Sequence, residues 1–142
     1  MITDDEGRVL LARRAREPDA GRWDTPGGFL EEAEDPLEGL RRELREETAL
    51  EVEPREFLGA FVDRYGGEDD AVSVLNLVWG ARVRSGEAEP ADDVSELRWF
   101  APAELPEADE YAFSWLAPFF REWVAEDGSE EAPKGRNFRP FG

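Results

Sequence analysis

Two residue types with strong chemical roles are missing from this chain, which contains no cysteine and no histidine. Without cysteine there is no disulfide framework, no thiolate metal site and no cysteine nucleophile. Without histidine, acid–base chemistry falls to carboxylates, tyrosine, Lys134 or metal-bound water. No apolar run reaches membrane-spanning length and no signal peptide is visible, so we expect a cytoplasmic protein that does not enter a membrane.

Positive charge is also scarce, because 17 Lys and Arg residues face 35 Asp and Glu residues, for a net charge of −18. Such a charge repels nucleic acid phosphates and excludes nucleic acid as an expected partner. A phosphorylated small molecule can still bind where cations neutralise the site, which favours a metal site. The 142 residues, of which 40% are hydrophobic, are enough for one domain with a substantial core.

The stretch from Gly27 to Leu50 combines a glycine loop with a short, heavily charged helix. Asp35 is suited to cap that helix and Pro36 to occupy its first turn. The buried face is marked by leucines at helical spacing, Leu37, Leu40 and Leu44. This pattern predicts a helix that packs on a core through one face and leaves its charged residues outside.

A second face of the predicted helix carries glutamates related by i,i+3 and i,i+4 spacing, Glu43, Glu46 and Glu47. At this spacing their carboxylates can converge on one point, where they repel one another unless a cation lies between them. Ligation by oxygen alone suits a hard divalent ion, so we expect Mg²⁺ or Mn²⁺. Arg42 can reach back to one of these carboxylates and fix its orientation.

This stretch resembles the box of the Nudix family, G-x5-E-x7-R-E-U-x-E-E-x-G-U, in which U is a bulky aliphatic residue. The matching positions are Gly28, Glu34, Arg42, Glu43, Leu44, Glu46, Glu47 and Leu50. Ala49 departs from the pattern, because the family has glycine there. Two flanking runs are also similar to the family: Trp23 to Gly28, which resembles Trp-x-x-Pro-Gly-Gly, and the strand-like run that begins at Glu96.

The resemblance implies an enzyme that hydrolyses a diphosphate linked to another group. It implies that Glu46 and Glu47 are metal ligands, that Glu43 is a ligand or the base, and that the Gly28 carbonyl is a further ligand. Glu34 and Arg42 would then orient the ligands from behind.

The resemblance leaves two places for the general base, because members of the family have it either in the box or on a later loop. The later candidates are Asp92, Asp93 and Glu96, of which we select Asp93. The runner-up is the turn that contains Glu68, Asp69 and Asp70. Candidate substrate contacts are Arg13 and Arg14, which could bind a diphosphate, and Trp23, which could equally be a core anchor.

The sequence is most similar to the branch called ADP-ribose or NADH pyrophosphatase, on the basis of the arginine-rich loop, Asp63 to Gly66 and Asn76 to Trp79. The expected substrate is therefore ADP-ribose or a related sugar nucleotide or dinucleotide. One alternative is a triphosphate pyrophosphohydrolase acting on oxidised nucleotides. Another is a Nudix-fold binding module without activity, which the intact glutamates argue against. A homodimer is left open.

The order of elements predicts a Nudix domain over residues 1–126, built as an α/β/α sandwich with a mixed sheet. The first strand is short, so the chain is either truncated there or receives that strand in another way. Further strands are expected at 8–13, 50–53, 57–65, 71–84 and 97–100, a closing helix at 111–125, and a mobile tail at 127–142. At Ala49 we expect either a left-handed backbone or a helix extended through Thr48.

Overall fold

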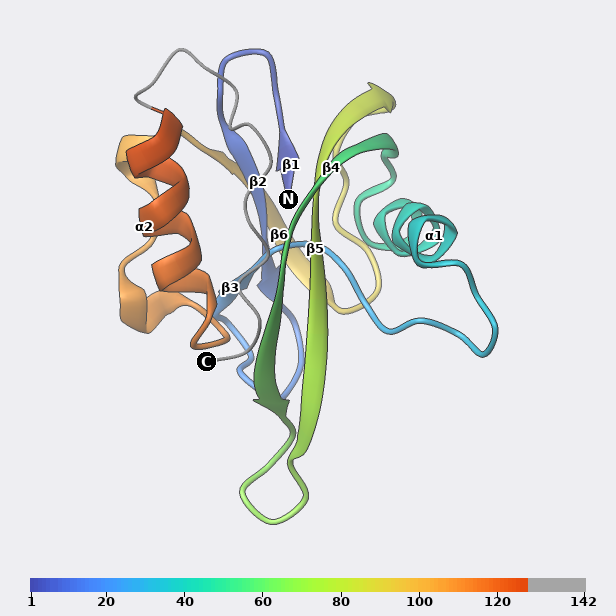
Figure 1. Cartoon of the computed structure of the whole chain (residues 1–142), viewed down its shortest axis with the longest axis vertical. Coiled ribbons are helices and arrows are strands. Elements are labelled where there is room, and N and C mark those ends of the chain that lie inside the picture. Colours follow the sequence, from blue (N-terminus) through green and yellow to red (C-terminus); the bar gives the residue numbers. More distant parts are fainter. Residues whose placement is uncertain (128–142) are drawn as a thin grey trace.

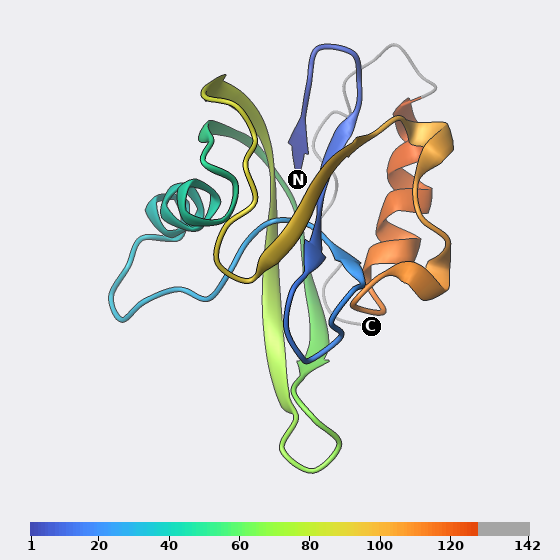
Figure 2. The same ribbon diagram turned by 180° about the vertical axis from the view of Figure 1, so that it is seen from behind.

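A mixed β-sheet with one helix on each face forms the centre of the molecule, as Figures 1 and 2 show from opposite sides. The computed structural model describes residues 1–127. The strands are β1 (Ile2–Thr3), β2 (Val9–Arg14), β3 (Trp23–Asp24), β4 (Glu51–Tyr65), β5 (Val72–Ser85) and β6 (Val94–Phe100). The helices are α1 (Pro36–Thr48) and α2 (Leu116–Asp127), with short 3₁₀ turns at Pro102–Glu104 and Ala108–Glu110. The predicted α/β/α sandwich is confirmed.

The sheet has the strand order β3-β2-β1-β5-β4. Strand β2 pairs with β1 at Val9 and Leu10 and with β3 at Ala12 and Arg13, and β6 also pairs with β2, along its whole length. Strand β1 runs parallel to β5 and antiparallel to β2, which makes the sheet mixed. The prediction of a short first strand is confirmed, because β1 contains two residues. Strands β2 and β5 continue past the end of β1, so that β1 no longer lies between them. Strands β4 and β5 project from the sheet as a long hairpin (Figure 1).

Two hydrophobic cores cover the two faces of this sheet. The core under α2 is rich in aromatic residues and includes Trp23, Phe100, Trp115, Phe119 and Phe120. The core under α1 is aliphatic and includes Ile2, Leu10, Leu44, Leu50, Val52 and Ala81. The leucines of α1 thus fix the charged helix to the sheet, and its carboxylates stay at the rim.

The sequence-based prediction of two strands at 50–53 and 57–65 is wrong, because β4 is continuous through Pro54. A proline is tolerated here because β4 lies at the edge of the sheet and the pairing register shifts between Pro54 and Glu56. Strand β6 begins at Val94, earlier than predicted.

The closing helix also differs from the prediction, because α2 begins at Leu116 rather than at residue 111. Tyr111 forms a bridge with Trp23, and the Ala112 N–H donates to the Trp23 carbonyl at 2.8 Å. The Ser114 N–H donates to Asp63, so the backbone of this segment is tied to two strands before the helix starts. The predicted tail lies outside the described residues apart from Asp127, the last residue of α2. Within residues 1–127, no helix is long and apolar enough to cross a membrane.

Candidate active site

The start of α1 is fixed by the cap that the sequence predicts. The Asp35 carboxylate accepts hydrogen bonds from the N–H groups of Leu37 and Glu38, at 3.1 and 3.2 Å. Pro36 occupies the first turn, where its missing N–H costs nothing. On the buried face, Leu44 is fully enclosed while Leu40 packs partly buried against the same core. These contacts set the rotation of the helix and hence the direction of its glutamates.

The end of α1 is held by the acidic loop that precedes β6. The buried Thr48 hydroxyl donates to the Leu44 carbonyl and accepts from the Leu50 N–H. The carbonyls of Thr48 and Glu47 accept hydrogen bonds from Glu89 and Ala91 of that loop, at 2.9 and 3.1 Å. Carbonyls at a helix end otherwise lack partners, so the loop is pinned to the box.

The backbone at Ala49 combines the two predicted routes, because α1 extends through Thr48 and Ala49 is left-handed. Its φ of 62° and ψ of 12° are left-handed, and its N–H donates to the Arg45 carbonyl. Glycine adopts this conformation without strain, which explains the family's preference at the position. Ala49 therefore carries local strain one residue beyond the buried Thr48.

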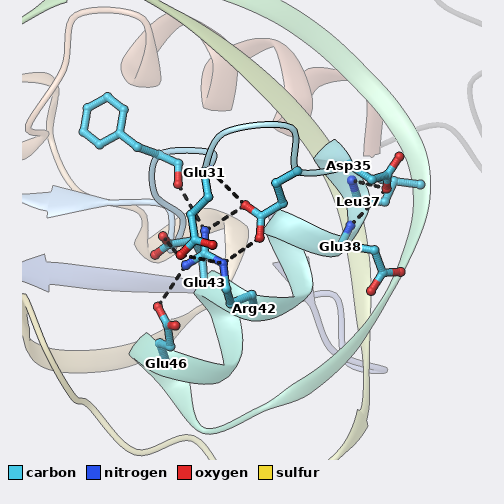
Figure 3. A network of polar contacts seen from close by, with 9 residues as sticks. Glu31, Asp35, Leu37, Glu38, Arg42, Glu43 and Glu46 are labelled. Atoms are coloured by element: carbon cyan, nitrogen blue, oxygen red, sulfur yellow. Dashed lines mark hydrogen bonds and ion pairs between the residues drawn. The ribbon is translucent and has the colours of Figure 1, made fainter.

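Arg42 lies at the centre of the carboxylate cluster (Figure 3). Its guanidinium binds both oxygens of Glu34, at 2.7 and 2.9 Å, and reaches Glu43 at 2.9 Å and Glu46 at 3.2 Å. It also donates to the Phe29 carbonyl at 3.2 Å. The hydrogen bonds from Arg42 lower the pKa of Glu34 to about 2. Arg42 thus links Glu34 to Glu43 and Glu46, and the orienting role of the Glu34–Arg42 pair stays a prediction.

Glu47 points away from Arg42 and toward the glycine loop, where its carboxylate accepts the Gly27 N–H at 3.0 Å. Gly28 packs directly on the neighbouring Glu43, since a Cβ at Gly28 would lie 2.3 Å from the Glu43 carboxyl carbon. A glycine is therefore needed at 28 for the backbone to approach Glu43 closely. The loop and the helix together place the backbone of Gly27 and Gly28 beside the carboxylates of Glu47 and Glu43.

Two of the box glutamates hold their protons more strongly than ordinary carboxylates. Burial raises the pKa of Glu47 to about 8, with further contributions from the charges of Glu43, Asp24 and Asp93. Burial likewise raises the pKa of Glu43, against the lowering effect of Arg42. Within residues 1–127, no three or more side chains of the types that bind metals (His, Cys, Asp and Glu) lie close enough together to hold a metal ion. The donor set is nevertheless all oxygen and short of positive charge, which fits a hard divalent cation.

A cavity of about 520 Å³ adjoins these residues, in the part of the sheet where β2 and β5 extend beyond β1. Its wall contains Glu43 and Glu47 together with Arg14, Tyr65, Asn76 and Phe113. Arg14 is held by its hydrogen bond to the Pro18 carbonyl and by the rings of Tyr65 and Phe113, at 5.8 and 5.6 Å. The cavity thus connects the carboxylates to a fixed cation.

The other predicted substrate contacts are arranged differently. Arg13 borders the cavity, but its guanidinium stacks on Trp23 at 4.6 Å and pairs with Glu96 at 3.2 Å. Trp23 is 4% exposed and belongs to the core under α2, so it is an anchor and does not line the cavity. Arg13 thus has the closer ion pair, whereas Arg14 lies 3.8 Å from the carboxylate of Asp24.

The candidates for the general base are separated by the fold. Asp93 borders the cavity and its carboxylate lies 3.3 Å from Arg16. Glu96 is engaged by Arg13 and Arg98, and Asp92 lies outside the cavity wall with a left-handed backbone. The runner-up turn at 68–70 lies at the tip of the β4–β5 hairpin, away from the box (Figure 1).

Asp24 is a site residue that the sequence did not reveal. It borders the cavity, its carboxylate lies 3.8 Å from Arg14, and burial raises its pKa to about 7. The only sequence signal was its place between Trp23 and Pro26 at the entrance to the glycine loop. A short polar residue in that position could equally have been exposed.

Comparison with known proteins agrees with this geometry. The NUDIX domain model matches residues 1–123, so the chain belongs to the Nudix family. A crystal structure of a NUDIX hydrolase from Nitrosomonas europaea superposes with a TM-score of 0.75 at 28% identity, covering 89% of this chain and 68% of the other. The chain is a Nudix pyrophosphohydrolase.

Two relatives carry names with different substrates. A Mycobacterium tuberculosis protein with the provisional name 8-oxo-dGTP diphosphatase 2 is 38% identical over 120 residues, which cover 83% of this chain and 77% of that protein. An ADP-ribose pyrophosphatase of Methanocaldococcus jannaschii is 31% identical over 105 residues, covering 74% of this chain and 61% of that protein. The family and its chemistry are common to both, whereas the substrate is not.

Proposed function

We propose that this enzyme hydrolyses a nucleoside diphosphate joined to a second group, with ADP-ribose or a related sugar nucleotide or dinucleotide as the substrate. The observation that carries the proposal is that Arg14 lines the same cavity as Glu43 and Glu47. Its closest carboxylate is Asp24, at 3.8 Å, whose pKa is raised by burial to about 7. Arg14 therefore keeps positive charge for a phosphate, to which a guanidinium can bind in bidentate fashion.

In the proposed reaction, water attacks one phosphorus of the diphosphate, and the bond from that phosphorus to the bridging oxygen breaks. The bridging oxygen leaves with the other phosphate, and Asp93 accepts the proton of the water. Mg²⁺ or Mn²⁺ would be held by Glu46, Glu47 and the Gly28 carbonyl, with Glu43 as a ligand or base. When bound, the ion supplies positive charge to the phosphate oxygens and makes water a better nucleophile.

Arg42 has a positioning role in this scheme. It holds Glu34, Glu43 and Glu46 through four hydrogen bonds, so it fixes their carboxylates before a cation arrives. A triphosphate substrate is the second candidate, favoured by the name of the Mycobacterium relative.

An assay of nucleoside monophosphate formation over a substrate panel tests the proposal. With Mg²⁺, we expect AMP formation from ADP-ribose to exceed formation of the monophosphates from dGTP and 8-oxo-dGTP, and excess chelator to abolish it. Glu46→Gln and Glu47→Gln should each lower kcat by at least about a hundredfold. The control is Glu38→Gln, a change on the same helix at an exposed residue paired with Arg41.

Three outcomes would contradict the proposal: full turnover in chelator, a preference for triphosphates, or near-normal kcat in either glutamate variant. A homodimer is a separate prediction from the family resemblance, and light scattering at several concentrations would decide it.

A further inference from the structure

An aromatic ring lies uncovered at the point where the glycine loop meets the cavity. Phe29 follows Gly28 directly, lines the cavity, and is 57% exposed. Its carbonyl accepts the hydrogen bond from Arg42, so its backbone is tied to the carboxylate cluster while its ring is not. A ring so close to phosphate-binding machinery, yet open to solvent, has apolar surface available for a ligand.

Two further rings continue this surface across the cavity wall. Phe29 meets Tyr65 edge-on, with ring centroids 5.1 Å apart at 81°, and Tyr65 meets Phe113 at 6.2 Å. The rings come from the glycine loop, the end of β4 and the segment before α2, which are far apart in the sequence. We call Phe29, Tyr65 and Phe113 the aromatic rim.

The aromatic rim is held in place from behind. Asp63, two residues before Tyr65, accepts hydrogen bonds from both the N–H and the hydroxyl of Ser114, each at 2.9 Å. Arg14 lies against Tyr65 and Phe113. Two of the rings are therefore fixed, while Phe29 has an edge-on contact that leaves much of its ring open.

We infer that the aromatic rim is the subsite for the base of the substrate and that the ring of Phe29 stacks on that base. The inference rests on the proposed function, because it assumes that the diphosphate lies between Arg14 and the box glutamates. Consecutive Cα atoms are about 3.8 Å apart, so Phe29 is adjacent to the Gly28 backbone that packs on Glu43. Stacking of this kind accepts any planar base and distinguishes nucleotides from diphosphates that have none.

The test compares Phe29→Ala, Phe29→Tyr and the control Phe57→Ala. Phe57 is 42% exposed, contacts Trp79 and does not line the cavity, so it matches the loss of an exposed ring. Calorimetry measures binding of AMP and of ribose 5-phosphate. Kinetics measure kcat and KM for the best nucleotide substrate and for phosphoribosyl pyrophosphate, a diphosphate without a base.

We expect Phe29→Ala to weaken AMP binding and raise the nucleotide KM by about tenfold, with kcat within about twofold. The same variant should change ribose 5-phosphate binding and the KM for phosphoribosyl pyrophosphate by less than about twofold, because neither compound has a base to stack. Phe29→Tyr keeps a stacking ring and should behave as the wild type, as should Phe57→Ala.

Equal weakening of the compounds with and without a base would overturn the inference, as would a fall in kcat without a rise in KM. Either result would mean that Phe29 only shapes the glycine loop. Wild-type protein that binds AMP no better than ribose 5-phosphate would also overturn it. If wild-type protein binds AMP through Phe29 but cleaves no sugar nucleotide, the proposed substrate fails while the subsite stands.

Discussion

Replacing Ala49 with glycine should stabilise the enzyme slightly. Ala49 has a φ of 62°, and an L-residue with a Cβ in this region pays on the order of 1 kcal/mol relative to glycine. The Ala49 side chain is exposed, so removing its methyl group forfeits little packing. Against this gain, glycine loses more freedom on folding, by roughly 0.4–1 kcal/mol. The net expectation is about 0.3 kcal/mol, or a rise in Tm of about 1 °C for a chain of this size.

Calorimetric melts of three variants would isolate the cause. Ala33 also has a left-handed backbone, with φ of 58°, and is exposed outside any helix, so Ala33→Gly should give a similar rise. Ala108 is exposed in a 3₁₀ turn without positive φ, so Ala108→Gly should lower Tm. We expect kcat of Ala49→Gly to stay within about threefold, since Thr48 and Leu44 fix the helix upstream.

The reasoning fails if Ala49→Gly melts lower than the wild type, as Ala108→Gly should, because the left-handed strain would then be negligible. A large rise in kcat would show instead that alanine at this position impairs the box.

Three further changes probe the site. In Gly28→Ala the new Cβ would lie 2.3 Å from the Glu43 carboxyl carbon, so Glu43 must move, and kcat should fall more than tenfold with little change in Tm; unchanged kcat would remove this contact from the mechanism. Arg42 lowers the pKa of Glu34 from 4.5 to about 2, so their ion pair stabilises the fold fully above pH 4.5 and is lost as pH falls through 2. Glu34→Gln should therefore lower Tm at pH 7 and have a much smaller effect near pH 2. An equal drop in Tm at both pH values would contradict the pairing. Burial raises the pKa of Asp24 from 3.8 to about 7, so the wild type loses stability as pH rises through that range. Asp24→Asn should raise the unfolding free energy at pH 8 by an amount of order 4 kcal/mol and change it little at pH 3.5. Denaturant titrations in which the effect of the substitution does not depend on pH would refute this.

Much of the active-site helix could be predicted from the sequence, because its determinants are local. Asp35, Pro36 and the leucine spacing act within a few residues of one another, and helix geometry then fixes which glutamates share a face. The two sides of the cavity were not predictable in this way. Arg13 and Arg14 are adjacent and chemically identical, and both border the cavity, but tertiary contacts place Arg13 on Trp23 and Arg14 against Tyr65 and Phe113.

Errors in the fold arose where tertiary contacts outweighed local preference. A proline normally ends a strand, but Pro54 lies in β4 at the edge of the sheet, where its missing N–H breaks no pairing with another strand. The aromatic periodicity from residue 111 is helical, yet the N–H groups of Ala112 and Ser114 bond to Trp23 and Asp63, and the helix starts only at Leu116. The aromatic periodicity therefore identified which rings are buried, whereas hydrogen bonds to distant strands determined where the backbone becomes helical.

The charge state of the site depends on the same distant contacts. The spacing of Glu43, Glu46 and Glu47 predicts convergence on a cation, but in the fold Arg42 holds two of them and Glu47 turns to Gly27. Glu47 is half-buried and makes no ion pair within residues 1–127, and its burial raises its pKa to about 8. A divalent cation would compete with protons for Glu47, so its binding should strengthen as pH rises toward 8 and should release protons. A calorimetric titration with Mg²⁺ in buffers of different ionisation enthalpy would measure that release, and its loss in Glu47→Gln would assign the proton to this carboxylate.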